Sequence, residues 1–386
     1  MTGFLRYLPI LPALALAGAA GGVNPPREEI EAFPGAPIAL LVDLSSGQTL
    51  FAREADRRFM PASITKVMTA FVAFELIDAG KLSPGASYTM SEQAYREWHG
   101  KGSRMFLDRS GPVTVETLLL GITSVSANDA SIVLAEGAAG SVDNWVSLMN
   151  AKAREIGMND SHFGTPNGWM DEGRTFTTAA DLAILAREMI TRHPQLYDFY
   201  FGREGMEYRG IAQANHDPIT GEVEGADGIK TGFTNQAGYG FLGSAERDGR
   251  RLVMVAATAP TPRDRNRASI AMIEWGFDAF DSRKLYPRGG YVGEALVQEG
   301  ARGTVPLVAA APIAATLPQG SSARPKLTIR YDGPLEAPLE EGEPVAELEI
   351  AVDGAPPSRV PLLAGEAVAR ANDWQRLKNG VVGLFR

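Results

Sequence analysis

The chain has 386 residues, 45% of them hydrophobic and 22% charged, which is the composition of a folded protein with room for two domains. Its net charge is −9 with both signs mixed along the chain, which argues against nucleic acid as a partner, because phosphate binding needs a basic face. Cysteine is absent, so disulfides and thiolate zinc sites are excluded. His99, His193 and His216 show no ligand-like spacing, and we expect neither a metal nor a cofactor.

The first 20 residues have the pattern of a secretory signal peptide. A single Arg6 precedes an apolar run from Leu8 to Leu16, and the small residues Ala17-Gly18-Ala19 follow. The run is shorter than the roughly 20 residues that a membrane-spanning helix needs. We therefore expect an exported, periplasmic protein from which residues 1–20 are removed.

The elements predicted next belong to an α+β domain over residues 33–283. Two strands flank the turn at Ser45-Ser46-Gly47, and helical patterns follow. These helices are predicted over 64–79, 115–123, 129–137, 142–157 and 177–193, the last capped by Thr177 or Thr178. From Gly225 strand-like runs return, with a hairpin at Asp248-Gly249, and a helix closes the domain. This order predicts an α+β layer fold whose sheet pairs the two ends of the domain.

Beyond about Tyr286 the pattern changes to short alternating runs rich in Pro, Gly and Val. Such runs predict a small all-β domain over residues 286–372. The tail 373–386 has an amphipathic set of apolar residues interrupted by Gly380. It fits peripheral contact with a membrane surface, or equally docking on the β domain.

Three short motifs carry the chemistry. Ser63-x-x-Lys66 stands at a predicted helix start, Ser126-Ala127-Asn128 between two helices, and Lys230-Thr231-Gly232 on a predicted strand. Taken alone, Ser63 fits a residue at a helix start with Lys66 in water. The ordered set S-x-x-K, S-x-N and K-T-G is instead typical of penicillin-binding proteins and class A β-lactamases.

The residue types suit an acyl transfer. Ser63 is a nucleophile that needs a base, and the i,i+3 spacing brings Lys66 within reach. Burial, a nearby cation such as Lys230 and the helix N-terminus all favour the neutral, basic form of Lys66. Ser126 would relay a proton between Lys66 and the leaving group, and Asn128 would hold a substrate amide.

The third motif is predicted to bind the end of the substrate. Lys230 and Thr231 offer a charge and a hydroxyl to a terminal carboxylate, and Gly232 lets the strand approach a ligand closely. The backbone N–H groups of Ser63 and Phe233 would form an oxyanion hole.

With these motifs the chain resembles the low-molecular-weight penicillin-binding proteins of the D-alanyl-D-alanine carboxypeptidase type. Matching segments include "LLLGITSVSANDAS", "HFGTPNGWMDEGRTFTTAADLA" and "GIKTGFTNQAGYGFLGSAERDGRRL". The resemblance runs from about Pro37 to Phe280 and continues more weakly into the β-rich part. It implies a β-lactamase/transpeptidase-like fold, an antiparallel sheet with helices on both faces, followed by a small all-β domain. For the tail it implies contact with the outer face of the inner membrane.

The resemblance also implies a reaction and a partner. The enzyme would remove the terminal D-alanine from peptidoglycan stem pentapeptides through an acyl-enzyme on Ser63, and β-lactams would trap it covalently. An arginine that helps hold the substrate carboxylate would be Arg265, with Arg263 and Arg267 close by in sequence. Phe233 stands where many relatives have histidine, which changes the polarity of the pocket.

Other readings stay open. A D-alanyl endopeptidase acting on cross-links would use the same site. A class A β-lactamase would need a further carboxylate, and the candidates Glu155 and Glu172 lack its Glu-x-x-x-Asn pattern. A non-catalytic envelope binding protein would not need Ser63, Lys66 and Ser126 intact. Two further residues are expected to have structural roles. His162 would be a hydrogen-bonding residue, and Asp129, next to Asn128, would cap the following helix.

Overall fold

The computed structural model describes residues 33–353 and 355–372, which fall into two compact units. The larger unit comprises residues 33–44 and 50–277, and the smaller one residues 45–49 and 278–372. The predicted signal peptide and the predicted tail lie outside the described residues, and the predicted domain limits stay predictions. Within the described ranges, none of the helices combines the length and the apolar character that crossing a membrane requires.

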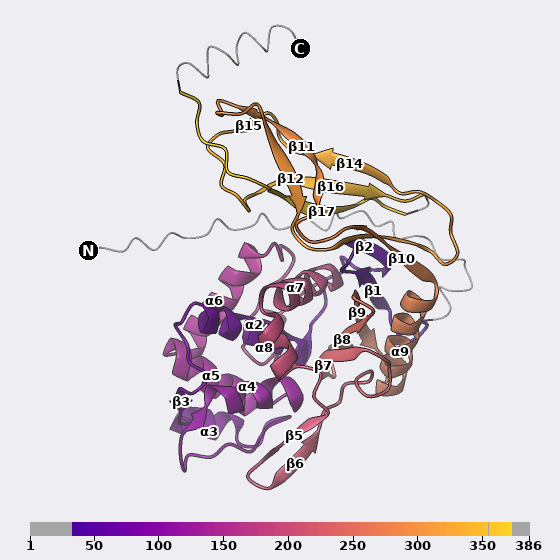
Figure 1. Cartoon of the computed structure of the whole chain (residues 1–386). Helices are drawn as coiled ribbons and strands as arrows, with labels where there is room; N and C mark the ends of the chain where they lie inside the picture. The colour runs from indigo at the N-terminus through magenta and orange to yellow at the C-terminus, as the bar shows by residue number, and fades with distance from the viewer. Residues whose placement is uncertain (1–32, 354, 373–386) are drawn as a thin grey trace. The chain divides into compact units, whose positions relative to one another are not determined.

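A five-stranded sheet with the order β2-β1-β9-β8-β7 forms the centre of the larger unit (Figure 1). Its strands are β1 Ile38–Asp43, β2 Gln48–Arg53, β7 Ala226–Thr234, β8 Gly238–Arg247 and β9 Arg250–Ala259. The predicted pairing of the two ends of the domain is confirmed, because β1 runs antiparallel to β9 with Ile38 opposite Ala257. The predicted hairpin is also present. Asp248 and Gly249 join β8 to β9 with positive φ angles of 52° and 78°, as a tight two-residue turn requires.

Helices cover both faces of this sheet, as predicted. All six residues of β1 are buried, which a strand needs when both of its faces are covered. On one face α7 contacts β1 and β9. On the other face α9 packs so closely that a Cβ atom at Gly276 would lie 2.7 Å from the side chains of Leu41 and Leu252. The longer helices are α2 Thr65–Asp78, α4 Val115–Ser124, α5 Asn128–Ala139, α6 Val142–Glu155, α7 Ala179–Arg192 and α9 Pro262–Asp278.

Helix α2 is the central helix of the helical part. All its residues from Thr65 to Phe74 are buried, and it contacts α4, α6 and α7. Its start differs from the prediction, because a 3-10 turn, η1 Ala62–Ile64, precedes it and contains Ser63. Helix α7 begins as predicted, with the Thr178 hydroxyl accepting from Asp181 N.

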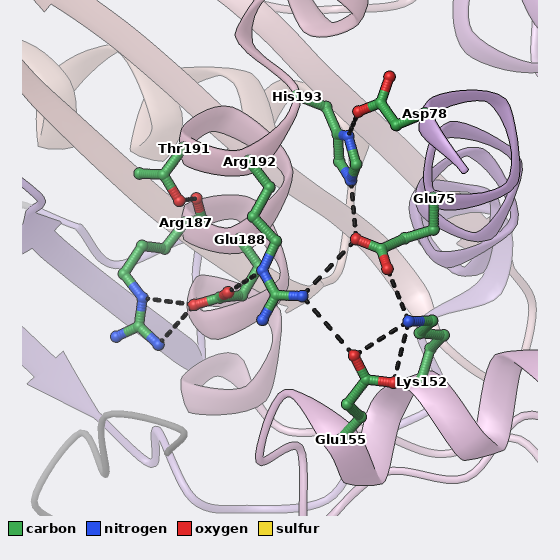
Figure 2. A network of polar contacts seen from close by, with 9 residues as sticks. All are labelled: Glu75, Asp78, Lys152, Glu155, Arg187, Glu188, Thr191, Arg192 and His193. Atoms are coloured by element: carbon green, nitrogen blue, oxygen red, sulfur yellow. Dashed lines mark hydrogen bonds and ion pairs between the residues drawn. The ribbon is translucent and has the colours of Figure 1, made fainter. Parts of the chain in front are cut away.

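A cluster of ion pairs fixes the far end of α2 to α6 and α7 (Figure 2). Lys152 Nζ lies 2.6 Å from Glu75 Oε2 and 2.9 Å from Glu155. His193, the residue after α7, contacts Glu75 Oε1 through Nε2 at 2.9 Å and Asp78 through Nδ1. Burial raises the pKa of Glu75, but the hydrogen bonds from His193 and Lys152 and the nearby positive charges outweigh it and lower that pKa to about 2.

Several short elements were not predicted from the sequence. They are β3 Ser87–Tyr88, α3 Glu92–Trp98, β4 Val113–Thr114, α8 Pro194–Tyr200, β5 Gly205–Tyr208 and β6 Ile211–Ala214. Helices of about two turns have little stability of their own, so tertiary contacts decide whether they form. One such contact is the hydrogen bond from the Tyr197 hydroxyl of α8 to Asp227 O of β7.

The smaller unit is sheet-rich, as predicted. A six-stranded sheet has the order β14-β16-β17-β12-β11-β15, and β10 pairs with β13. The strands are β10 Phe280–Tyr286, β11 Tyr291–Gln298, β12 Thr304–Ala309, β13 Ile313–Pro318, β14 Lys326–Arg330, β15 Leu335–Glu336, β16 Pro344–Ala351 and β17 Ser358–Ala364. Buried apolar residues of several strands, among them Leu307, Leu348 and Leu362, form its own hydrophobic core.

Candidate active site

Ser63 and Lys66 lie against each other at the start of α2. Lys66 Nζ is 2.9 Å from Ser63 Oγ, the reach expected for side chains three residues apart across a helix start. Ser63 is half-buried, whereas Lys66 is 1% exposed. The expectation that Lys66 is buried is therefore confirmed.

Lys66 Nζ has two further hydrogen-bond partners, and both are oxygen acceptors. Nζ lies 2.8 Å from Asn128 Oδ1 and 2.7 Å from the carbonyl oxygen of Asn167. The orientation of the Asn128 amide is fixed, because its Nδ2 faces the carbonyl oxygen of Lys101. Both oxygens can only accept, so they take the two N–H groups of a neutral amine. Once Lys66 has lost a proton, the remaining lone pair of Nζ is available to the hydroxyl of Ser63, which accepts from Nζ at 2.9 Å when the lysine is charged.

The electrostatic surroundings favour that neutral form. Burial lowers the pKa of Lys66 well below its usual value, and the charge of Lys230 lowers it further, while Asp129 acts in the opposite direction. A buried lysine with no carboxylate bonded to it is suited to act as a base.

The second motif lies beside this pair. Asn128 is the first residue of α5 and is buried, with its backbone N–H donating to Ser103 O. Ser126 is 6% exposed and has a φ of +61°, an uncommon conformation for a non-glycine residue. Among the described residues the Ser126 hydroxyl has no hydrogen bond, so its relay role stays a prediction.

The prediction that Asp129 caps α5 is wrong. The N-cap residue is Ala127, without a side-chain cap bond, and Asp129 lies inside the first turn. Its carboxylate accepts from Ala130 N of that turn and from the backbone N–H groups of Met105 and Leu107. Asp129 therefore fixes the loop that leads up to the site, because a buried carboxylate binds the nearest unpaired donors.

The third motif lies on β7, directly against the 3-10 turn of Ser63. A Cβ atom at Gly232 would lie 2.4 Å from Pro61 O and 3.1 Å from Ile64 Cγ1. Any side chain at this position would clash, so glycine allows β7 to lie directly against the segment that carries Ser63. Thr231 is half-buried beside it.

Two basic residues of the site, Lys230 on this strand and Arg265 on α9, are buried. Lys230 is 3% exposed, and burial lowers its pKa to about 7, with Asp217 raising it and Arg265 lowering it. Burial also lowers the pKa of Arg265 to about 10. Arg263 and Arg267 are exposed, so of the three arginines only Arg265 is buried. The charge of Arg265 acts on Lys230, and Asp217 raises the pKa of both residues.

Phe233, the next residue of β7, is 47% exposed and stacks on Tyr239 at 4.1 Å between ring centroids. The edge of the site beyond Gly232 is therefore aromatic. His162 is exposed and contacts Arg174 O through Nδ1, as a structural hydrogen-bonding residue. Glu155 is part of the ion-pair cluster on α6, and Glu172 is exposed.

One residue at the site was missed from the sequence. Asn167 is 1% exposed, and its carbonyl oxygen is a partner of Lys66. It belongs to "HFGTPNGWMDEGR", a segment that matches the family, and the following Gly168 was the available signal. Gly168 has a φ of +72°, and a Cβ atom there would lie 1.8 Å from Ala62 O.

A serine paired with a buried lysine, beside a glycine-bearing strand and two cations, defines the class of serine enzymes that work through acyl transfer. The chain belongs to the D-alanyl-D-alanine carboxypeptidase family. The model of that family matches residues 26–261, and the model of the penicillin-binding protein 5 C-terminal domain matches residues 280–370.

Individual relatives agree with this membership. The D-alanyl-D-alanine carboxypeptidase DacA of Haemophilus influenzae is 32% identical over 371 residues, which are 94% of this chain and 92% of the relative. Crystal structures of penicillin-binding protein 5 from Haemophilus influenzae match with a TM-score of 0.75 and 32% identity, over 87% of this chain and 98% of that one. Penicillin-binding protein D2 from Listeria monocytogenes, in an ampicillin-bound form, matches with a TM-score of 0.56 and 27% identity, over 63% of this chain and 98% of that one.

Proposed function

We propose that this protein is a serine-type D-Ala-D-Ala carboxypeptidase that removes the terminal D-alanine from peptidoglycan stem pentapeptides. The observation that carries the proposal is the buried Lys66, whose Nζ lies 2.9 Å from Ser63 Oγ and whose pKa burial lowers well below its usual value. Membership of the D-alanyl-D-alanine carboxypeptidase family supports the choice of substrate.

The substrate binds through its terminal carboxylate. Lys230 and Arg265 supply charge and Thr231 a hydroxyl, and together they select a free C-terminus over an internal peptide bond. Asn128 holds the amide of the preceding residue. The scissile carbonyl then lies with its oxygen toward the backbone N–H groups of Ser63 and Phe233.

Acylation follows from the proton positions. Ser63 Oγ attacks the carbonyl carbon while its proton passes to Lys66 Nζ, and the backbone donors stabilise the oxyanion. The bond to the terminal D-alanine breaks as its nitrogen takes a proton from Lys66 through the Ser126 hydroxyl. Water then hydrolyses the ester on Ser63. A β-lactam acylates the same serine and blocks it, and an ampicillin-bound structure exists for the Listeria relative.

We further propose that the protein is exported to the periplasm after removal of residues 1–20. The tail 373–386 is proposed to contact the outer face of the inner membrane. Edman sequencing of the purified protein tests the removal of residues 1–20. Release of the protein from washed membranes by salt tests the membrane contact of the tail. A mature chain that still begins at Met1 contradicts the first, and a chain without 373–386 that stays bound to membranes contradicts the second.

The function is tested by incubating the purified protein with a stem pentapeptide and with a cross-linked muropeptide. We expect release of free D-alanine from the pentapeptide and loss of this activity in Ser63→Ala. Cleavage of the cross-link alone would make the protein an endopeptidase. Cleavage of neither substrate would contradict the proposal.

A further inference from the structure

The proposed reaction has a second half for which no side chain is yet assigned. Release of the acyl group needs a water molecule held where it can attack the ester on Ser63. The side chains of all three motifs already have parts in substrate binding or acylation. Neither sequence candidate for the dedicated carboxylate of a class A β-lactamase suits this site, since Glu155 is paired with Lys152 and Glu172 is exposed.

Asn167 offers an unused donor at this place. Its carbonyl oxygen is 2.7 Å from Lys66 Nζ, and its side-chain Oδ1 accepts from Trp169 N at 3.0 Å. Its Nδ2 is buried and has no hydrogen-bond partner among the described residues. A buried amide N–H without a partner is costly, so this group requires one in solution.

The position of Asn167 is tightly fixed. Gly168 allows the loop to lie against the turn of Ser63, as the 1.8 Å approach of its would-be Cβ atom to Ala62 O requires. The Thr69 hydroxyl of α2 donates to Pro166 O at 2.6 Å, and Gly168 N donates to the Thr165 hydroxyl. The backbone of the loop that carries this donor is thus held against the helix start that carries the nucleophile and its base.

We propose that Asn167 Nδ2 is a positioning group that holds the hydrolytic water of deacylation beside Lys66. Before acylation the lone pair of Lys66 Nζ faces the hydroxyl proton of Ser63. In the acyl-enzyme Ser63 Oγ carries no proton, so that lone pair is free to accept one from water. A water molecule that accepts from Asn167 Nδ2 and donates to Lys66 Nζ lies next to the ester.

The step balances without a further reactant. The water oxygen forms a bond to the acyl carbon, and one of its protons passes to Lys66 Nζ. The bond between the acyl carbon and Ser63 Oγ then breaks, and Lys66 returns the proton to Oγ. The products are the shortened peptide with a free carboxylate and the original enzyme.

This inference rests on the proposed function and is tested by separating acylation from deacylation. A fluorescent penicillin is mixed with the full-length protein, and the rates of labelling and of label loss are measured for wild type and Asn167→Ala. The control is Thr165→Ala, which removes a side-chain bond of the same turn but leaves the Asn167 amide in place. Thermal melting of each variant checks that the fold is kept.

We expect Asn167→Ala to be labelled within about 3-fold of the wild-type rate and to lose its label at least about 10-fold more slowly, because a misplaced nucleophile costs that much or more. Thr165→Ala should change both rates by similar, small factors. Label loss at the wild-type rate in Asn167→Ala, or equal slowing of both steps, overturns the inference. A wild-type protein that takes no label would instead contradict the proposed function itself.

Discussion

At the scale of single residues, the site holds two buried lysines with opposite requirements. Lys66 must be neutral to accept the proton of Ser63, whereas Lys230 must be charged to bind a carboxylate. Burial lowers the pKa of both. Their charged neighbours differ as well: the charge of Lys230 lowers the pKa of Lys66 further while Asp129 raises it, and Asp217 raises the pKa of Lys230 while Arg265 lowers it, which leaves Lys230 at about 7.

This difference predicts a bell-shaped pH dependence. On the acid side, kcat/KM should fall as Lys66 becomes protonated. On the alkaline side it should fall above about pH 7, because Lys230 then loses the charge that binds the substrate carboxylate. The measurement is the pH profile of D-alanine release by the free enzyme under kcat/KM conditions.

Lys230→Arg separates the two limbs. Its guanidinium stays charged throughout the range, so the alkaline limb near pH 7 should disappear while the acid limb remains. An unchanged alkaline limb in this variant would show that another group produces it.

At the scale of elements, the approach of β7 to the turn η1 holds the site together. Gly232→Ala would place a methyl group 2.4 Å from Pro61 O, so one of the two elements must move. We expect a cost of about 1–3 kcal/mol in unfolding free energy and labelling by penicillin slowed at least about 10-fold. Gly111→Ala is the matched control, because nothing lies within 4 Å of its added Cβ atom. Equal labelling rates in the two variants would contradict this part of the account.

The ion-pair cluster at the far end of α2 predicts a pH-dependent contribution to stability (Figure 2). The pKa of Glu75 falls from 4.5 to about 2 on folding, so its contribution is present above pH 4.5 and is lost as the pH falls toward 2. Allowing for partial solvent screening, we expect Glu75→Gln to cost about 2 kcal/mol at pH 7. Urea unfolding at pH 7 and pH 3 measures it. A difference between wild type and variant that is as large at pH 3 as at pH 7 would be inconsistent with this reading.

At the scale of the whole molecule, the sequence predicts the sheet, the long helices and the element type under each motif. These follow from periodic apolar runs and turn residues, which are local signals. The contacts made by distant segments could not be read in this way. Asn167 meets Lys66 only because Gly168 permits a close approach, and Asp129 binds a loop more than twenty residues earlier in addition to Ala130 N of its own helix. The resemblance already pointed to Arg265 among three neighbouring arginines, and the packed helix adds that it is the buried one of the three.

The division into two units predicts that the larger one carries the whole reaction. All the site residues discussed above lie within residues 50–277. We expect a chain ending at Asp278 to be labelled by fluorescent penicillin within about 3-fold of the full-length rate, provided that circular dichroism shows it folded, since domains with their own core keep their sites. A folded but unlabelled chain would mean that the smaller unit contributes to the reaction.

The central claim is that Ser63 forms an acyl-enzyme with Lys66 as its base. Intact-mass analysis after incubation with a penicillin, followed by peptide mapping, tests it most directly. The account predicts one penicilloyl group per chain on the peptide that contains Ser63, none in Ser63→Ala, and labelling slowed by about 10²–10⁴-fold in Lys66→Ala. An adduct on another residue, or undiminished labelling of Ser63→Ala, would contradict it.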